Sequence, residues 1–194
     1  MELIGALMQE HRLIERVVRL MQEEMERVNR GEEPDLGLIG SFIEFIHSYA
    51  DLVHHGKEED ILFKSLAEKP LTPEHRNIMN GLIADHESSR NSVATLLSAK
   101  NAYAAGNPGV KSEIVSRLNN LVKLYPGHIA TEDKQFFFPT LEYFTRQERD
   151  SLLLQGREFD RKFIHDQYRL MVEELEKSVP NSRQVHVPAK PSAL

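Results

Sequence analysis

The chain has 194 residues, a formal net charge of −6 and no cysteine. The absence of cysteine excludes disulfides, thiolate zinc sites, Cys-ligated iron–sulfur clusters and a cysteine nucleophile, so His and carboxylate must hold any bound metal. The acidic balance argues against a surface for nucleic acid or for an anionic membrane, because both need clustered positive charge. The N-terminus does not resemble a signal peptide, and the richest apolar run, 36–46, is too short to span a bilayer. We therefore expect a cytoplasmic protein.

The apolar residues recur every three or four positions along the chain, which predicts helices throughout and no strands. Asp35 and Thr72 stand where helix N-caps are expected, and Gly31 follows the end of the first pattern. The four long helices predicted in this way cover residues 2–29, 36–67, 72–105 and 110–143.

Four long helices with short loops indicate an all-α fold, an up-down-up-down four-helix bundle over residues 1–143. Thr145 and Glu148 form a capping-box pattern that begins a fifth helix, which we expect to end near Lys177 within a segment 144–178. We expect this helix to pack on the outside of the bundle, and the alternative is a homodimer through it. The proline-containing tail, 179–194, reads as disordered.

Two helical hairpins carry the same His pattern. His11 in the first helix precedes His54 by 43 residues, and His86 in the third precedes His128 by 42. His54 and His128 each begin a His-x3-Glu pair, whose residues are neighbours on one helix face and can share a metal. Chance alone predicts about one such pair in this composition, so the repeat carries more weight than any single pair. It predicts ligands around a pseudo-twofold axis.

A single His on an apolar helix face is more often a core residue than a ligand, and a single Glu is most often a solvated charge. Considered together, these groups do not fit that interpretation. A core that buried several ionisable groups at one level without a counter-charge would lose several kcal/mol for each charged group. A dinuclear metal centre would provide the counter-charge.

The order His, His-x3-Glu, His, His-x3-Glu resembles the hemerythrin-like, or HHE cation-binding, family. The segment 54–63, His-His-Gly-Lys-Glu-Glu-Asp-Ile-Leu-Phe, is similar to the family's second-helix motif, and the segment 128–139 resembles its fourth-helix motif. The resemblance covers about residues 5–142. It implies two iron ions with an oxo or hydroxo bridge, held by His11, His54, Glu58, His86, His128 and Glu132.

The residue after the second-helix His is also a ligand in some members of the family, which adds His55 and leaves Glu59 as its competitor. Five His and two carboxylates are the ligand count of the oxygen-carrying hemerythrins. Those carriers have a His-x3-His on the third helix, whereas this chain has Leu82 and Arg90 around His86.

The ligand types set the chemistry that we expect. Imidazole and carboxylate suit iron, manganese or zinc. Bridging by Glu58 and Glu132 together with a hydroxide leaves two divalent ions with a small positive charge, whereas a ferritin-like site with four carboxylates is more negative. A His-rich site favours retention of Fe(II), so we expect binding or sensing of dioxygen or a related small ligand. The alternatives are a di-iron enzyme in peroxide or nitric-oxide handling or in iron delivery for iron–sulfur repair, and a structural bundle with a vestigial site.

Two helix-breaking residues lie close to the candidate ligands. Pro126 removes one backbone hydrogen bond inside the fourth helix, and Gly56 lies in the corresponding part of the second. We expect both to loosen the helices so that the ligands can reach the metal, and the alternative for Pro126 is a bend around the core.

Overall fold

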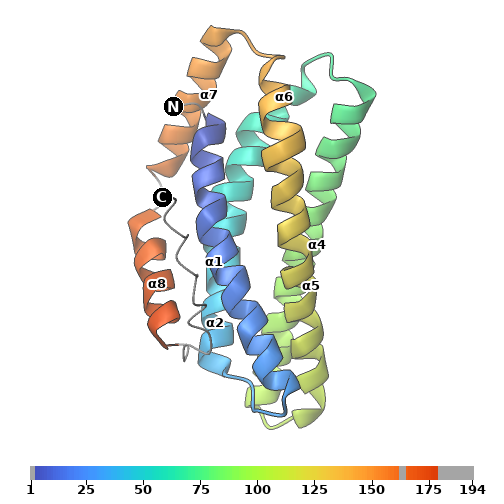
Figure 1. Cartoon of the computed structure of the whole chain (residues 1–194), viewed down its shortest axis with the longest axis vertical. Helices are drawn as coiled ribbons and strands as arrows, with labels where there is room; N and C mark the ends of the chain where they lie inside the picture. Colours follow the sequence, from blue (N-terminus) through green and yellow to red (C-terminus); the bar gives the residue numbers. More distant parts are fainter. Residues whose placement is uncertain (1–2, 162–164, 179–194) are drawn as a thin grey trace, which may run out of the picture.

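The computed structural model describes residues 3–161 and 165–178, and all regular structure in this part of the chain is helical. Four long rods run alternately down and up, which confirms the all-α bundle (Figure 1). In chain order the rods are α1 (Leu3–Asn29), the composite rod 36–67, α4 (Pro73–Ala104) and the composite rod 111–141.

The two composite rods change their helical geometry along their length. The second rod comprises α2 (Leu36–Phe45), η1 (Ile46–His55), η2 (Glu58–Phe63) and α3 (Lys64–Ala67). The fourth rod follows a short 3₁₀ turn, η3 (Pro108–Val110), and comprises α5 (Lys111–Thr131), η4 (Glu132–Phe136) and α6 (Phe137–Leu141). The segments η1, η2 and η4 are π-helical. A π turn closes i→i+5 hydrogen bonds and holds an extra residue, a geometry that is common at functional sites.

The helix ends follow the caps that the sequence predicts. The Asp35 side chain accepts hydrogen bonds from the backbone N–H groups of Gly37 and Leu38, and the Thr72 side chain accepts one from His75 N–H. Thr145 and Glu148 form the expected capping box. These side chains satisfy N–H groups that have no partner within their own helix.

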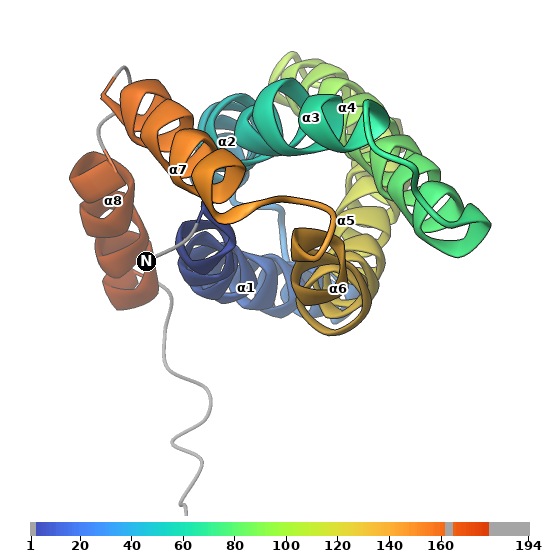
Figure 2. The ribbon, with the colours of Figure 1, turned by 90° about the horizontal axis from the view of Figure 1, so that it is seen from above.

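The single fifth helix expected up to Lys177 is two helices, α7 (Arg146–Asp160) and α8 (His165–Ser178). Both lie against α1 on one side of the bundle (Figure 2). Gly156 allows this approach, because a Cβ there would lie 2.5 Å from Leu3 Cδ1. The tail 179–194 lies outside the described residues, so its expected disorder stays a prediction.

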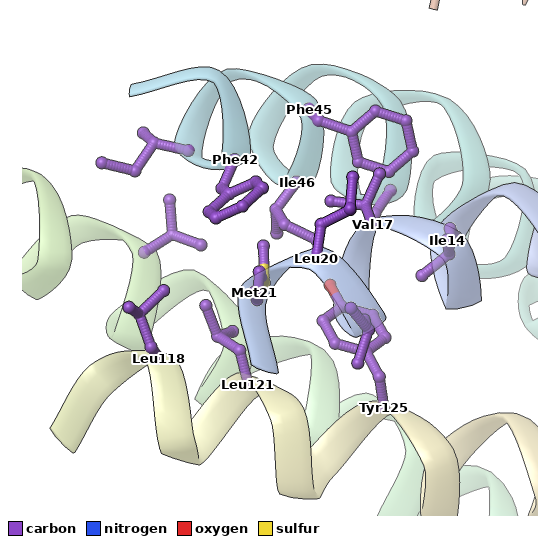
Figure 3. Packing of buried hydrophobic residues seen from close by; sticks show 14 of the residues in the cluster. Ile14, Val17, Leu20, Met21, Phe42, Phe45, Ile46, Leu118, Leu121 and Tyr125 are labelled. Atoms are coloured by element: carbon purple, nitrogen blue, oxygen red, sulfur yellow. The ribbon is translucent and has the colours of Figure 1, made fainter. Parts of the chain in front are cut away.

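The apolar interior consists of two clusters at different heights in the bundle. The larger cluster fills the half shown in Figure 3, where the rods contribute residues such as Met21, Phe42 and Leu121. The second cluster fills the other half and includes Leu7, Phe63, Phe136 and Leu141. On α1 the two sets are separated by His11, and on the second rod by 54–58. A polar layer therefore crosses the bundle between two dry cores.

One helix of the described chain, Leu36–Ala67, is long and apolar enough by length and composition to cross a membrane. The same helix directs His54, His55 and Glu58 into the bundle, and all three are buried there. Core helices of soluble proteins pass the same test of length and composition, so this finding is weak evidence for a membrane span.

Candidate metal centre

The polar layer contains every residue that the sequence proposed as a ligand. α1 and α4 each contribute one His, the second rod contributes two His and a Glu, and the fourth contributes a His and a Glu. The most exposed of the seven side chains retains only 3% of its accessible surface. The seven residues are His11, His54, His55, Glu58, His86, His128 and Glu132.

Their ligand atoms form two groups that share one carboxylate. In each group all ligand atoms lie within 4.8 Å of one another. Glu58 belongs to both groups, with Oε1 at 3.5 Å from His54 Nε2 and Oε2 at 3.3 Å from His86 Nε2. The first group consists of His55, Glu58, His86 and His128, and the second consists of His11, His54, Glu58 and Glu132.

Glu132 also lies between the two groups. Its Oε2 is 3.2 Å from His11 Nε2 and 3.3 Å from His128 Nε2. The positions of Glu58 and Glu132 therefore suit the bridging roles proposed for them, with the imidazoles as terminal ligands.

The donor set fits a pair of cations. Both oxygens of Glu58, both oxygens of Glu132 and Nε2 of His55 are buried without a hydrogen-bond partner. Buried carboxylates that lack partners are strongly unfavourable, because they have lost their hydration. Two metal ions, one within each group, would give these atoms a partner and would balance the negative charge of the two carboxylates.

A second ring of carboxylates surrounds the imidazoles. Each of the five His residues places Nδ1 beside a carboxylate oxygen, which favours the tautomer with the proton on Nδ1 and the lone pair of Nε2 directed inward. The pairs are His11–Asp133 at 2.8 Å, His54–Glu10 at 2.9 Å, His55–Asp51 at 3.3 Å, His86–Glu59 at 2.7 Å and His128–Asp85 at 3.2 Å.

Four of the five outer carboxylates were not predicted from the sequence, and the fifth, Glu59, was named only as a competing ligand. A local signal nevertheless exists for four of the five. Glu10 and Asp85 each precede a ligand His, whereas Glu59 and Asp133 each follow a ligand Glu. An acid that precedes a His serves the second His of the same hairpin, and an acid that follows a Glu serves the first His of the other hairpin. The pseudo-twofold pattern therefore extends to the outer ring.

His55 and Glu59, the two competing candidates for one ligand position, differ in their place in the layer, because His55 belongs to one of the two groups. Glu59 lies outside both ligand groups and accepts hydrogen bonds from Arg90 at 2.6 Å and from His86 Nδ1. Arg90 also donates to Asp51 at 2.8 Å. Arg90 occupies one of the two third-helix positions at which the oxygen carriers could have their second His. Here it binds Asp51 and Glu59, the outer partners of His55 and His86.

Two phenylalanines cover the imidazoles symmetrically. Phe137 stacks on His11 with ring centroids 5.7 Å apart and planes 8° apart, and Phe63 stacks on His86 at 6.0 Å and 10°. Each phenylalanine follows the second-helix His of its own hairpin by nine residues and stacks on the first-helix His of the other hairpin. These two rings place apolar surface against one imidazole of each ligand group.

The electrostatics of the layer follow from burial and from charge pairing. Burial lowers the pKa of His54 and of His55 well below the ordinary value, so both imidazoles are neutral. Burial alone would raise the pKa of Glu132, but the imidazoles of His128 and His11 lower it to about 2. At His11, His86 and His128 the neighbouring carboxylates outweigh burial and raise the pKa, to about 10 for His128. Metal binds neutral imidazoles and ionised carboxylates, so metal binding would displace the protons of these three residues.

Gly56 lies between the π segments η1 and η2 and has a packing role that the sequence did not indicate. That Gly56 loosens the helix for the ligands stays a prediction. Its backbone is ordinary right-handed helix, with φ −58° and ψ −42°. A Cβ at this position would lie 2.8 Å from Phe159 Cζ, so the glycine makes room for the ring of Phe159 on α7. Pro126 lies inside α5, which continues helically to Thr131. The departures from α geometry occur in the π segments that contain or adjoin the ligands.

The bundle and its buried layer of five imidazoles and two carboxylates define a helical metal-binding protein. The family model of the hemerythrin HHE cation-binding domain matches residues 2–137, and the chain belongs to this family. No curated protein and no solved structure matched the chain. The match ends before α7, so the two C-terminal helices lie outside the family domain.

Proposed function

We propose that this protein holds two iron ions in the polar layer and binds or senses dioxygen or a related small ligand there. The observation that carries the proposal is the donor set, in which five imidazoles accompany only two inner carboxylates. A centre with few negative ligands retains Fe(II), whereas a four-carboxylate site favours oxidation. Manganese and zinc suit the same ligand types, so the metal itself has to be measured.

The two ligand groups differ in their number of imidazoles. His55, His86 and His128 would hold one iron ion and His11 and His54 the other, with Glu58 and Glu132 shared between them. The second ion would therefore have one protein ligand fewer than the first. Two iron ions bound in this way would supply the redox-active pair and one open coordination position for a diatomic ligand.

The surrounding residues favour binding over turnover. Phe63 stacks on His86, and Phe137 stacks on His11. These apolar rings beside the inner ligands would limit the access of water and protons to the metal ions. The outer carboxylates fix the direction of each imidazole. A rigid, dry site of this kind can take up a small neutral ligand without other chemistry.

The test is to load the full chain anaerobically with Fe(II), count the bound metal, and follow near-ultraviolet absorption on exposure to air. Two irons per chain, with an oxo-bridge band that reverses on deoxygenation, are the expected result. Irreversible oxidation, or peroxide consumption without an added reductant, would overturn the binding role in favour of the enzyme alternative. Metal-free protein with an unaltered melting temperature would indicate a vestigial site.

Self-association is a separate proposal. α7 and α8 lie against α1 of their own chain, as expected for intrachain packing, and Val172 of α8 is fully buried there. A homodimer through these helices stays a prediction, which the molar mass in solution tests directly.

A further inference from the structure

The second-helix His residues of the two hairpins have unequal outer partners. His54 Nδ1 pairs with Glu10, whose side chain is 7% exposed, whereas His128 Nδ1 pairs with Asp85, which is 45% exposed. The first-helix His residues are more alike, because Asp133 beside His11 and Glu59 beside His86 each accept a hydrogen bond from an arginine. The asymmetry is therefore concentrated at Glu10.

A fully buried lysine accounts for the difference. Lys57 has no exposed side-chain surface, and its ammonium group donates to Glu10 Oε1 and to Asp160 Oδ1, the latter at 2.6 Å. In the other hairpin the corresponding position is Thr131, whose hydroxyl donates to the carbonyl of Gly127 at 3.0 Å. Only the first hairpin therefore has a buried cation behind its outer carboxylate.

Asp160 comes from outside the family domain. It is the last residue of α7, and its neighbour Phe159 fills the space left by Gly56. The resulting chain of contacts is Asp160–Lys57–Glu10–His54, which runs from the C-terminal helices into the ligand group of His11 and His54. A buried ammonium needs this second carboxylate, because removal of one partner from a buried ion pair leaves an uncompensated charge.

We propose that Asp160 and Lys57 are positioning residues of the metal centre, which hold Glu10 against His54 and so make α7 part of the site of the ion bound by His11 and His54. The inference rests on the proposed dinuclear function, and it adds a dependence that the family domain alone does not contain. An outer partner that fixes a ligand His contributes about 10- to 100-fold to metal affinity.

The experiment measures metal release from the full chain loaded anaerobically with two Fe(II), using an excess of a ferrous chelator and the colour of the chelate. The variants are Asp160→Asn, the conservative Asp160→Glu, and Lys57→Met. The matched control is Glu176→Gln, which removes the pair between α8 and Arg16 at 2.6 Å without touching the chain of contacts. Asp160 is 28% exposed and Glu10 remains beside Lys57, so we expect Asp160→Asn to fold even if Lys57→Met does not.

We expect Asp160→Asn to release one of its two ions about 10- to 100-fold faster than the wild type and the other at an unchanged rate. Asp160→Glu restores slow release, and Glu176→Gln releases both ions as the wild type does. The melting temperature of the metal-free protein falls in Asp160→Asn, because the buried Lys57 loses one of its two carboxylate partners. This selective effect on one ion separates positioning from general destabilisation.

Wild-type release rates for both ions in Asp160→Asn would overturn the inference while leaving the proposed function intact. Equal acceleration of both ions, shared with Glu176→Gln, would also overturn it, because the C-terminal helices would then act only through stability. A wild-type chain that binds fewer than two irons would overturn the proposed function together with this inference.

Discussion

The two hairpins of the bundle, residues 3–67 and 73–141, carry the same ligand motif but differ in what surrounds it. His54, Glu58 and Phe63 in the first hairpin correspond to His128, Glu132 and Phe137 in the second, each 74 residues later. In contrast, His55 corresponds to Ile129, and α7 contacts η2 of the first hairpin. The repeat therefore supplies a symmetric set of ligands, and single neighbouring residues make the two metal positions unequal.

The largest expected effect is that of the shared carboxylate. Glu58→Ala removes a ligand from both groups, so we expect bound iron to fall from two ions to fewer than one per chain. Glu132→Ala removes the second carboxylate that lies between the two groups, so bound iron is expected to fall below two ions per chain. Elemental analysis after anaerobic loading measures both results.

Glu15→Ala is the matched control, because Glu15 has the same His-x3-Glu spacing after His11 but pairs with Arg12 at the surface. Two ions per chain in Glu58→Ala would contradict the assignment of the bridge.

The second-largest expected effect is that of a substitution that gives the two hairpins the same residue at one position. His55→Ile places in the first hairpin the residue type of Ile129, and it removes one imidazole from the three-His group. We expect the affinity for one ion to fall more than about tenfold, since even loss of an outer partner costs 10- to 100-fold. A competitive metal titration measures the change, and unchanged affinity would exclude His55 as a ligand.

Two glycines near the ligands are expected to respond with opposite signs. Gly56→Ala places a Cβ against Phe159 and should destabilise the protein by about 1 kcal/mol, because overpacking exceeds the gain in helix propensity. Gly127→Ala meets no atom within 4 Å and should stabilise α5 by about 1 kcal/mol. Denaturant unfolding of the metal-free proteins gives both values. Equal stabilisation by both changes would show that α7 does not depend on Gly56.

The smallest effect concerns the ion pair that ties the start of α7 to the end of the first hairpin. Lys69 donates to Glu148 at 2.6 Å and, together with Thr145, lowers the pKa of Glu148 to about 2. Because the folded-state pKa lies below the unfolded value, this contribution is present above about pH 4.5 and is lost as the pH falls toward 2. Glu148→Gln should therefore lower the melting temperature slightly at pH 6 and have a smaller effect at pH 3. An equal effect at both pH values would contradict the assignment.

Much of the fold could be predicted because helix signals are local. Asp35, Thr72 and the pair Thr145/Glu148 cap helices through bonds to residues two or three positions away, and a local pattern contains that information. The fifth helix was predicted as one unit because its apolar spacing continues past Asp160. The sequence pattern did not show that the regular structure divides into α7 and α8 there.

The inner residues of the candidate site could also be predicted from local sequence patterns. A repeated His-x3-Glu needs only helical periodicity to place both side chains on one face, and the seven proposed ligands do converge. The outer ring depends on pairs such as His11–Asp133 and His55–Asp51–Arg90, most of which join residues far apart in the sequence. The sequence places four of these acids next to a ligand, but only the packing of the rods shows which imidazole each of them meets.

The sequence by itself determined the all-α bundle, the absence of thiolate ligands and the identity of the residues that meet in the polar layer, because helical spacing and composition are properties of short segments. Only the tertiary structure decided that Glu59 supports His86 outside both ligand groups, that Gly56 receives Phe159, and that Asp160 reaches His54 through Lys57. These contacts depend on how rods distant in sequence pack together, since packing brings a buried charge and its partner within bonding distance.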